Sequence, residues 1–116
     1  VYNNGIMQRD FTYIDDIISG TISILDSCKE DTNNNFSKVY NIGNNKPENL
    51  LDFISIIEDY LGIKAIKIMM PLQQGDVTNT YADISEIKAD FNFVPKTKLI
   101  EGIPKFIDWY KYYHKI

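Results

Sequence analysis

Apolar side chains recur every three or four positions over residues 15–28, as they do along one face of a helix. Asp15 or Asp16 is placed to cap the amino end of this segment. A polar, Asn-rich stretch over residues 29–36 then breaks the pattern. We predict a first helix here, with an apolar face formed by Ile14, Ile17, Ile18, Ile22, Leu25 and Cys28.

A second helix is predicted over residues 48–62, where the helical period is unbroken. Asn49 and Asp52 have the spacing of a capping box, and Gly62 is typical of a residue that stops a helix. The predicted apolar face consists of Leu50, Phe53, Ile54, Ile57, Tyr60 and Leu61.

Two further helices are predicted toward the carboxyl end. Residues 83–91 form a short one, which begins with Asp83 and Glu86 in capping-box spacing. Residues 97–116 have the helical period, but Pro104 lacks an amide hydrogen and its ring clashes with the preceding turn. We therefore expect a short first piece and a main helix that starts near Pro104.

Strands are predicted at two places. Residues 38–45 are a β-branched and aromatic run that Gly43 and Asn44 end, and residues 65–71 alternate in polarity. Because helices outnumber strands, the fold class is α/β, or α+β for residues 1–116 taken as an isolated piece.

The composition fits one globular domain. The 116 residues are 44% hydrophobic and 13% aromatic, which supports a packed core and argues against disorder. The formal net charge of -4 disfavours a surface for polyanions, so we expect no nucleic-acid partner.

Cys28 is the only cysteine and His114 the only histidine, so we expect neither an internal disulfide nor a metal site. No apolar run approaches the roughly 20 residues that span a bilayer, and no signal peptide is visible. These features predict a cytoplasmic protein without membrane contact. The opening residues "VYNNG" lack an initiator Met and look like the end of a strand, which predicts a truncated chain.

No complete active site is visible, because Gly-rich phosphate turns and Ser or Cys nucleophile motifs are absent from the sequence. Two polar stretches, residues 5–16 and 71–83, combine acids with hydrogen-bonding groups beside predicted helix starts. Arg9 is the only arginine, and its planar fork of donors matches a phosphate or carboxylate. The alternative is a structural ion pair from Arg9 to Asp10 or Asp15.

The second polar stretch holds three more candidates. Asp76 follows Gly75, and its carboxylate either supports the turn through backbone amides or accepts two hydroxyls from a ribose or hexose. Gln73 and Gln74 either donate to phosphate or sugar oxygens or are simply solvated.

The remaining conspicuous side chains are interpreted as structural. Asp16 and Asp83 each precede an apolar periodic stretch and are read as helix caps. The aromatic residues over 109–113 have helical spacing, which favours a packed helix face over stacking on bases. His114 is interpreted as a solvated residue that interacts with the helix dipole.

Taken in order, "RDFTYIDDI", "VYNIGN" and "PLQQGDVTNTYADISEIKADFNFVPKTKLIEGIPKFIDWY" resemble the carboxyl-terminal third of the extended short-chain dehydrogenase/reductase family. Within that family the sequence is most similar to the nucleotide-sugar 4-epimerases, particularly the UDP-glucuronate 4-epimerase type. The resemblance covers essentially all 116 residues. It implies a substrate-binding domain fragment over residues 1–116, with a Rossmann-type amino-terminal domain missing from the chain.

The resemblance assigns substrate-binding roles to five residues. Arg9 matches the arginine that binds the nucleotide diphosphate, while Gln73 and Asp76 match residues contacting the diphosphate and the uridine ribose. Tyr2 falls where the family packs a side chain against uracil, and Thr80 falls where many galactose-type epimerases have a substrate-contacting tyrosine. Galactose-type relatives often carry arginine at the position of Gln73, so glutamine favours the glucuronate-like branch.

The resemblance also implies NAD as cofactor and places catalysis upstream of this chain. In the family, a GxxGxxG turn binds the NAD pyrophosphate and a Tyr-x-x-x-Lys pair supplies the base. We expect neither motif here. NAD takes a hydride from C4 of the sugar, the 4-keto intermediate rotates, and the hydride returns to the other face. The fragment alone is therefore expected to be inactive. In this family such sugars commonly enter surface polysaccharides.

Three alternatives stay open: a nucleotide-sugar 4,6-dehydratase or a decarboxylase of the same family, or a non-catalytic interaction domain in which Arg9 and Asp76 are structural. The expected partners are a UDP-sugar and the protein's own amino-terminal Rossmann domain. Separation from that domain would expose apolar surface and a strand edge. The resulting hypothesis is that the isolated chain self-associates, as a homodimer or a swapped dimer.

Overall fold

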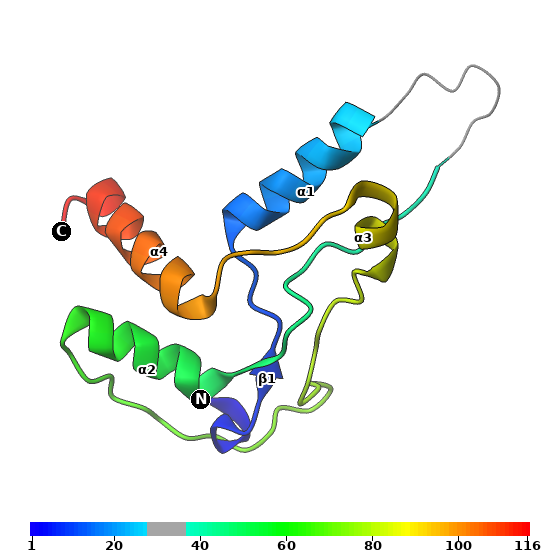
Figure 1. The fold of residues 1–116 in the computed structure, drawn as a ribbon. Helices are drawn as coiled ribbons and strands as arrows, with labels where there is room; N and C mark the ends of the chain where they lie inside the picture. Colours follow the sequence, from blue (N-terminus) through cyan, green and yellow to red (C-terminus); the bar gives the residue numbers. More distant parts are fainter. Residues whose placement is uncertain (28–36) are drawn as a thin grey trace.

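The structure, a computed structural model, describes residues 1–27 and 37–116 (Figure 1). Its elements are, in order, η1 (Tyr2–Gly5, a 3₁₀ helix), β1 (Gln8–Arg9), α1 (Ile14–Ser27), β2 (Glu48–Asn49), α2 (Leu50–Leu61), α3 (Ser85–Phe91) and α4 (Leu99–His114). Cys28 and the polar break predicted over residues 29–36 lie outside the described residues.

The helices form where the apolar periods predict them. In α2, Asn49 occupies the N-cap position, although its side chain makes no capping hydrogen bond. Gly62 ends the helix with φ of 68°, a left-handed conformation that glycine adopts without steric strain. In α1, Asp15 and Asp16 lie within the first turn, so the prediction that one of them is the N-cap is wrong.

The helix α4 is continuous from Leu99, and the separate start predicted near Pro104 is wrong. The first turn is closed ahead of the proline, because the amides of Glu101 and Gly102 both donate to the carbonyl of Lys98, at 3.0 and 2.9 Å. A proline removes only one amide donor from a helix. Once this turn has formed, α4 continues through Pro104.

The sheet is small. β1 and β2 form one antiparallel pair in which Gln8 lies opposite Asn49 and Arg9 lies opposite Glu48. These are the only strands in the described residues, so the strands predicted over 38–45 and 65–71 are wrong. A strand requires a partner for its backbone groups, and side-chain composition alone does not reveal whether the chain supplies one.

Both segments are held by other contacts. The side chains of Lys38 and Tyr40 donate to Asp90 in α3, at 2.6 and 2.7 Å. The backbone of Met70 bonds to the amino-terminal residues in both directions: its amide donates to Val1 at 2.9 Å, and its carbonyl accepts from Asn4 at 3.0 Å. The segment after α2 therefore runs beside η1 (Figure 1).

The helices pack in two pairs. α1 lies against α3, and α2 lies against α4 (Figure 1). Between α1 and α3 the buried core consists of Ile84, Ile87 and Phe93. In α4, Ile103 and Ile107 are buried. The aromatic rings of Phe11 and Phe53 stack with centroids 4.3 Å apart and connect the segment after β1 to α2.

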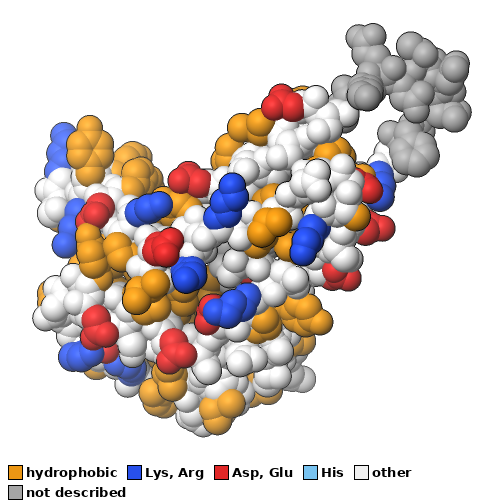
Figure 2. Space-filling view, in the orientation of Figure 1, with side chains coloured by type: hydrophobic (Ala, Val, Ile, Leu, Met, Phe, Trp, Pro, Cys, Tyr) orange, Lys and Arg blue, Asp and Glu red, His pale blue; other side chains and the backbone are white. Residues whose placement is uncertain are grey.

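The molecule is open for its length. Its radius of gyration is 17.8 Å, whereas a compact domain of this size would have about 13 Å. This openness leaves an apolar stripe of α1 exposed on successive turns. The exposed fractions are 58% for Ile14, 48% for Ile18, 49% for Ile22 and 71% for Leu25. Figure 2 shows hydrophobic side chains along α1 and around α4, with charged side chains between them.

Candidate functional site

The two polar stretches meet at one ion pair. Arg9 Nη2 donates to Asp76 Oδ1 at 2.8 Å, although the two residues are 67 positions apart in the sequence. Both side chains are about one quarter to one third exposed, at 26% and 32%. The structural ion pair anticipated from Arg9 to Asp10 or Asp15 is therefore wrong, since the partner lies in the other polar stretch.

Backbone hydrogen bonds hold the two stretches side by side. The Gln8 amide donates to the Thr78 carbonyl at 2.8 Å, and the Thr80 amide donates to the Gln8 carbonyl at 3.3 Å. Arg9 Nη1 donates to the carbonyl of Gln8 at 2.9 Å, which fixes the guanidinium against its own strand. Since β2 pairs with the other side of β1, backbone hydrogen bonds hold this strand on both sides.

A tight turn presents Asp76 to Arg9. The Asp76 amide donates to the Gln73 carbonyl at 3.1 Å, and Gly75 lies at φ of 84°, where a side chain would be strained. Asp76 Oδ1 also accepts from the Val77 amide at 2.8 Å. The hydrogen bond to the Val77 amide supports the interpretation of Asp76 as a turn residue, whereas the interpretation as a ligand for ribose or hexose hydroxyls stays a prediction.

The other three candidates lie along the same region without contacting Arg9 in this structure. Gln73 is exposed at the start of the turn, and Thr80 is exposed where its amide bonds to β1. Tyr2 is in η1 and 47% exposed. The structure therefore brings Arg9 and Asp76 into direct contact, while Gln73 and Thr80 lie in the same loop as Asp76 and Tyr2 lies in η1.

From the sequence, Asp10 was considered only as an ion-pair partner of Arg9, yet its carboxylate accepts three backbone amides in the site region. It accepts the amide of Asn44 at 3.0 Å, that of Asn45 at 3.0 Å and that of Ala82 at 2.9 Å. A Cβ on Gly43 would lie 2.9 Å from Asp10 Oδ2 and 2.5 Å from Cβ of Ala82. No sequence signal reveals such a role, because every residue except proline offers a backbone amide.

Asp16 and Asp83 were both interpreted as caps, with different outcomes. Asp16 is 6% exposed, and its carboxylate accepts the amides of Lys96 and Thr97, at 3.1 and 2.9 Å, so it joins α1 to the segment before α4. Asp83 accepts the Ser85 amide at 2.9 Å at the start of α3, which is close to the predicted role. Hydrogen bonding to Ser85 lowers the pKa of Asp83.

A buried acid at the end of α2 was also missed. Glu58 is 4% exposed and contacts Lys67, with Lys64 at 3.1 Å and the Ala65 amide donating at 3.0 Å. These contacts, that with Lys67 first, lower the pKa of Glu58 to about 2. The carboxylate therefore stays ionised and fixes the start of the segment that leads to Gln73.

One Tyr-x-x-x-Lys spacing does occur, at Tyr60 and Lys64, contrary to the expectation that this motif is absent. The helix ends between the two residues, and Lys64 pairs with Glu58. The hydroxyl of Tyr60 donates to Asp108 at 2.6 Å, which raises the pKa of the tyrosine. A general base needs a pKa near the working pH, so the hydrogen bond opposes this role.

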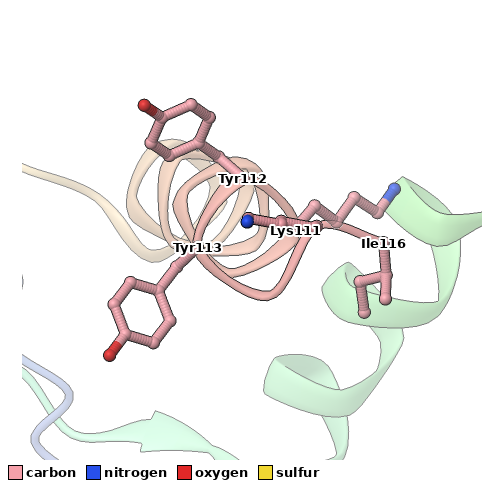
Figure 3. Close-up of a pocket in the computed structure, with 5 residues that line it drawn as sticks. Lys111, Tyr112, Tyr113 and Ile116 are labelled. Carbon is pink, nitrogen blue, oxygen red and sulfur yellow. The ribbon is translucent and has the colours of Figure 1, made fainter.

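A shallow hollow lies at the end of α4, away from these residues. Its lining consists of Lys111, Tyr112, Tyr113, Lys115 and Ile116, and Figure 3 shows the two tyrosine rings directed away from each other. All five side chains are exposed, so the hollow offers no enclosed site. Within residues 1–27 and 37–116, no cluster of metal-ligating side chains and no helix able to cross a membrane was found.

No family model matches the chain. UDP-glucuronate 4-epimerase 2 of Arabidopsis thaliana is 40% identical over 121 residues, which cover 97% of this chain and 28% of that protein. Protein CapI of Staphylococcus aureus is 44% identical over 128 residues, covering 99% of this chain and 38% of that protein. The UDP-glucuronic acid 4-epimerase of Bacillus cereus, in complex with UDP-glucuronic acid and NAD, superposes with a TM-score of 0.83 at 34% identity, covering 97% of this chain and 35% of that one.

The chain is therefore similar in sequence and in fold to UDP-glucuronate 4-epimerases, which are extended short-chain dehydrogenase/reductase enzymes. The predicted resemblance and fold class are thereby confirmed. The chain spans only about a third of the length of these relatives and corresponds to a carboxyl-terminal part of this short-chain dehydrogenase/reductase fold.

The Bacillus cereus enzyme is in complex with NAD, which confirms the prediction that NAD is the cofactor of the family. In the family the pyrophosphate lies against a helix amino end that follows a Gly-rich turn. Here the helices α1, α2, α3 and α4 follow "RDFTY", "NKPEN", "TYADI" and "VPKTK", none of which contains glycine. None of the helix starts in residues 1–27 and 37–116 therefore has the Gly-rich turn that binds the NAD pyrophosphate in the family.

Proposed function

We propose that this chain is the substrate-binding part of an NAD-dependent UDP-sugar 4-epimerase of the UDP-glucuronate type. The observation that carries the proposal is the 2.8 Å contact between Arg9 and Asp76, which joins the two polar stretches into one surface. The two nearby relatives named as UDP-glucuronate epimerases support the choice of sugar nucleotide.

Arg9 would bind the diphosphate. A guanidinium has five N–H donors, of which the contacts with Gln8 and Asp76 use two. The remaining donors can bind phosphate oxygens in the planar geometry that arginine favours. Because the Gln8 carbonyl and Asp76 already hold the guanidinium of Arg9, it is oriented before the ligand arrives, which lowers the entropic cost of binding.

Asp76 would bind the ribose. Its contacts with Arg9 and with the Val77 amide both use Oδ1, so Oδ2 can accept a ribose hydroxyl. Gln73, at the first position of the same turn, would contact the diphosphate, and Tyr2 would pack against the uracil ring. Thr80 would lie closest to the sugar. These five assignments are part of the proposal.

The rest of the enzyme would supply NAD and the acid–base residues. The exposed stripe of Ile14, Ile18, Ile22 and Leu25 on α1 would then be covered by the amino-terminal domain, since an apolar stripe of this length is rarely left in water. We further propose that the fragment is inactive alone, that it dimerises or swaps elements when isolated, and that the enzyme acts in the cytoplasm to supply polysaccharide synthesis.

The test is calorimetric titration of UDP and of UDP-glucuronic acid into the chain and into an Arg9→Ala variant. Saturable binding that the variant loses supports the proposal. Lys46→Ala is the matched control, because it removes a cation whose 2.7 Å ion pair with Glu48 lies beside the same sheet. Equal loss in both variants would mean that net charge alone attracts the nucleotide.

If the chain binds nothing, the titration is repeated after the amino-terminal domain is added. Binding that appears then, and that depends on Arg9, retains the proposal and shows that the site is shared between domains. Absence of binding in both experiments overturns it and favours a non-catalytic interaction domain.

A further inference from the structure

The carboxylate of Asp10 stands at the junction of three segments. It follows Arg9 directly, and it accepts backbone amides from Asn44 and Asn45 in one loop and from Ala82 in another. The distances are 2.9 to 3.0 Å, within the usual range of N–H···O hydrogen bonds. One carboxylate thus binds two loops to the end of β1 through hydrogen bonds.

The consequence for the candidate site lies in the segment from Asp76 to Ala82. Arg9 holds its first residue and Asp10 holds its last, so adjacent side chains fix the two ends of the segment that includes Thr80. If the Ala82 end is released, the orientation of this segment depends only on the Arg9–Asp76 ion pair and on the backbone bonds to Gln8.

We propose that Asp10 is a positioning residue for nucleotide-sugar binding, which acts through the loops it holds and does not touch the ligand. This inference rests on the function proposed above for Arg9 and Asp76. Close packing supports it, because Gly43 leaves no room for a Cβ between Asp10 and Ala82. The glycine lets the two loops approach the same carboxylate.

The inference is tested in the full-length enzyme, with NAD bound, by steady-state kinetics with UDP-glucuronic acid. Asp10→Asn keeps the shape of the side chain but replaces one acceptor oxygen with a donor, so it cannot hold all three amides. We expect KM to rise about tenfold while kcat changes less than about twofold, the pattern of lost ground-state and transition-state binding alike.

Asp16→Asn is the matched control. Asp16 is also a part-buried clamp on backbone amides, but it holds Lys96 and Thr97, away from Arg9. The Asp16→Asn substitution should lower thermal stability and leave KM unchanged. If both variants lose stability and neither changes KM, Asp10 is only structural and the inference is overturned.

Gly43→Ala is an independent route to the same junction, useful if Asp10→Asn fails to fold. It should raise KM in the same way, and the double variant should be no worse than the more severe single one, because both act on one contact. Unchanged KM in a folded Gly43→Ala protein counts against the proposal.

Arg9→Ala is measured in parallel to separate two kinds of failure. If Arg9→Ala does not raise KM, the proposed substrate site is wrong whatever Asp10 does. If Arg9→Ala raises KM and Asp10→Asn does not, only the positioning role of Asp10 is refuted.

Discussion

The contribution of Asp16 to stability can be predicted from the two backbone amides that its carboxylate accepts. In Asp16→Ala, the amides of Lys96 and Thr97 lose the carboxylate that they contact at 3.1 and 2.9 Å. Hydrogen bonds to a charged group contribute roughly 1.5–3 kcal/mol each. Because both bonds end on one side chain, and because Lys96 is exposed and can bond to water, the two losses should not add fully. We expect a decrease of about 2–4 kcal/mol in the free energy of unfolding.

The control is Asp15→Ala. Asp15 is exposed in the same first turn of α1, so its removal takes away the same charge near the helix amino end without disturbing the clamp. That charge contributes roughly 0.3–1 kcal/mol through the helix dipole. The difference between the two variants therefore isolates the hydrogen bonds of Asp16 from the dipole effect.

The assay is urea unfolding followed by circular dichroism. With a slope of about 1.5 kcal/mol per molar, the midpoint for Asp16→Ala should fall by roughly 1–3 M, and that for Asp15→Ala by less than about 1 M. If the two midpoints agree, Asp16 acts only as a charge at a helix end, and the argument from its burial and contacts is refuted.

Three other predictions concern stability. The pKa of Glu58 is lowered to about 2 in the folded protein, so its ion pairs stabilise the fold at any pH above the ordinary pKa of a glutamate. The free energy of unfolding should therefore exceed that of Glu58→Gln near neutral pH, and this difference should shrink as the pH falls from about 5 toward 2. A difference that does not change with pH contradicts this prediction. In Gly62→Ala the new Cβ meets no atom within 4 Å, so the variant should lose about 1 kcal/mol of the free energy of unfolding, from its φ of 68° alone. In Gly5→Ala the new Cβ also lies 2.6 Å from a side-chain carbon, so this variant should unfold at a clearly lower urea concentration. Equal midpoints for the two variants would contradict the packing argument. Ile87→Ala should cost about 2–5 kcal/mol, because the side chain is 0% exposed, while Ile100→Ala, 65% exposed, should stay within about 0.5 kcal/mol in the same assay.

Local signals in the sequence predicted both ends of α2. The stop at Gly62 and the N-cap position of Asn49 depend only on residues within a turn of each other, so they could be read from the sequence. The strands predicted over 38–45 and 65–71 failed for the opposite reason. Pairing depends on a distant partner, and β-branched composition shows only that a segment suits a sheet.

The candidate site was predicted in its members but not in its geometry. Arg9 and Asp76 were each identified from their own motif, yet their pairing follows from contacts across 67 residues, which no short motif encodes. Asp10 and Asp16 were missed as clamps because their partners are backbone amides. The type of a side chain can be read from the sequence, whereas a backbone amide is present at every position except proline and therefore marks none of them.

The first sixteen residues of the chain make their key contacts with segments that follow much later. The amino terminus bonds to Ile68, Arg9 to Asp76, Asp10 to Ala82, and Asp16 to Lys96 and Thr97, with separations of 67 to 81 residues. During synthesis, which proceeds from the amino end, α1 and α2 can form as soon as they emerge, but these contacts cannot. Contacts of high sequence separation slow folding. The surface formed by Arg9 and Asp76 should therefore be among the last parts to assemble, and until then the segment carrying Arg9 is accessible to proteases and chaperones.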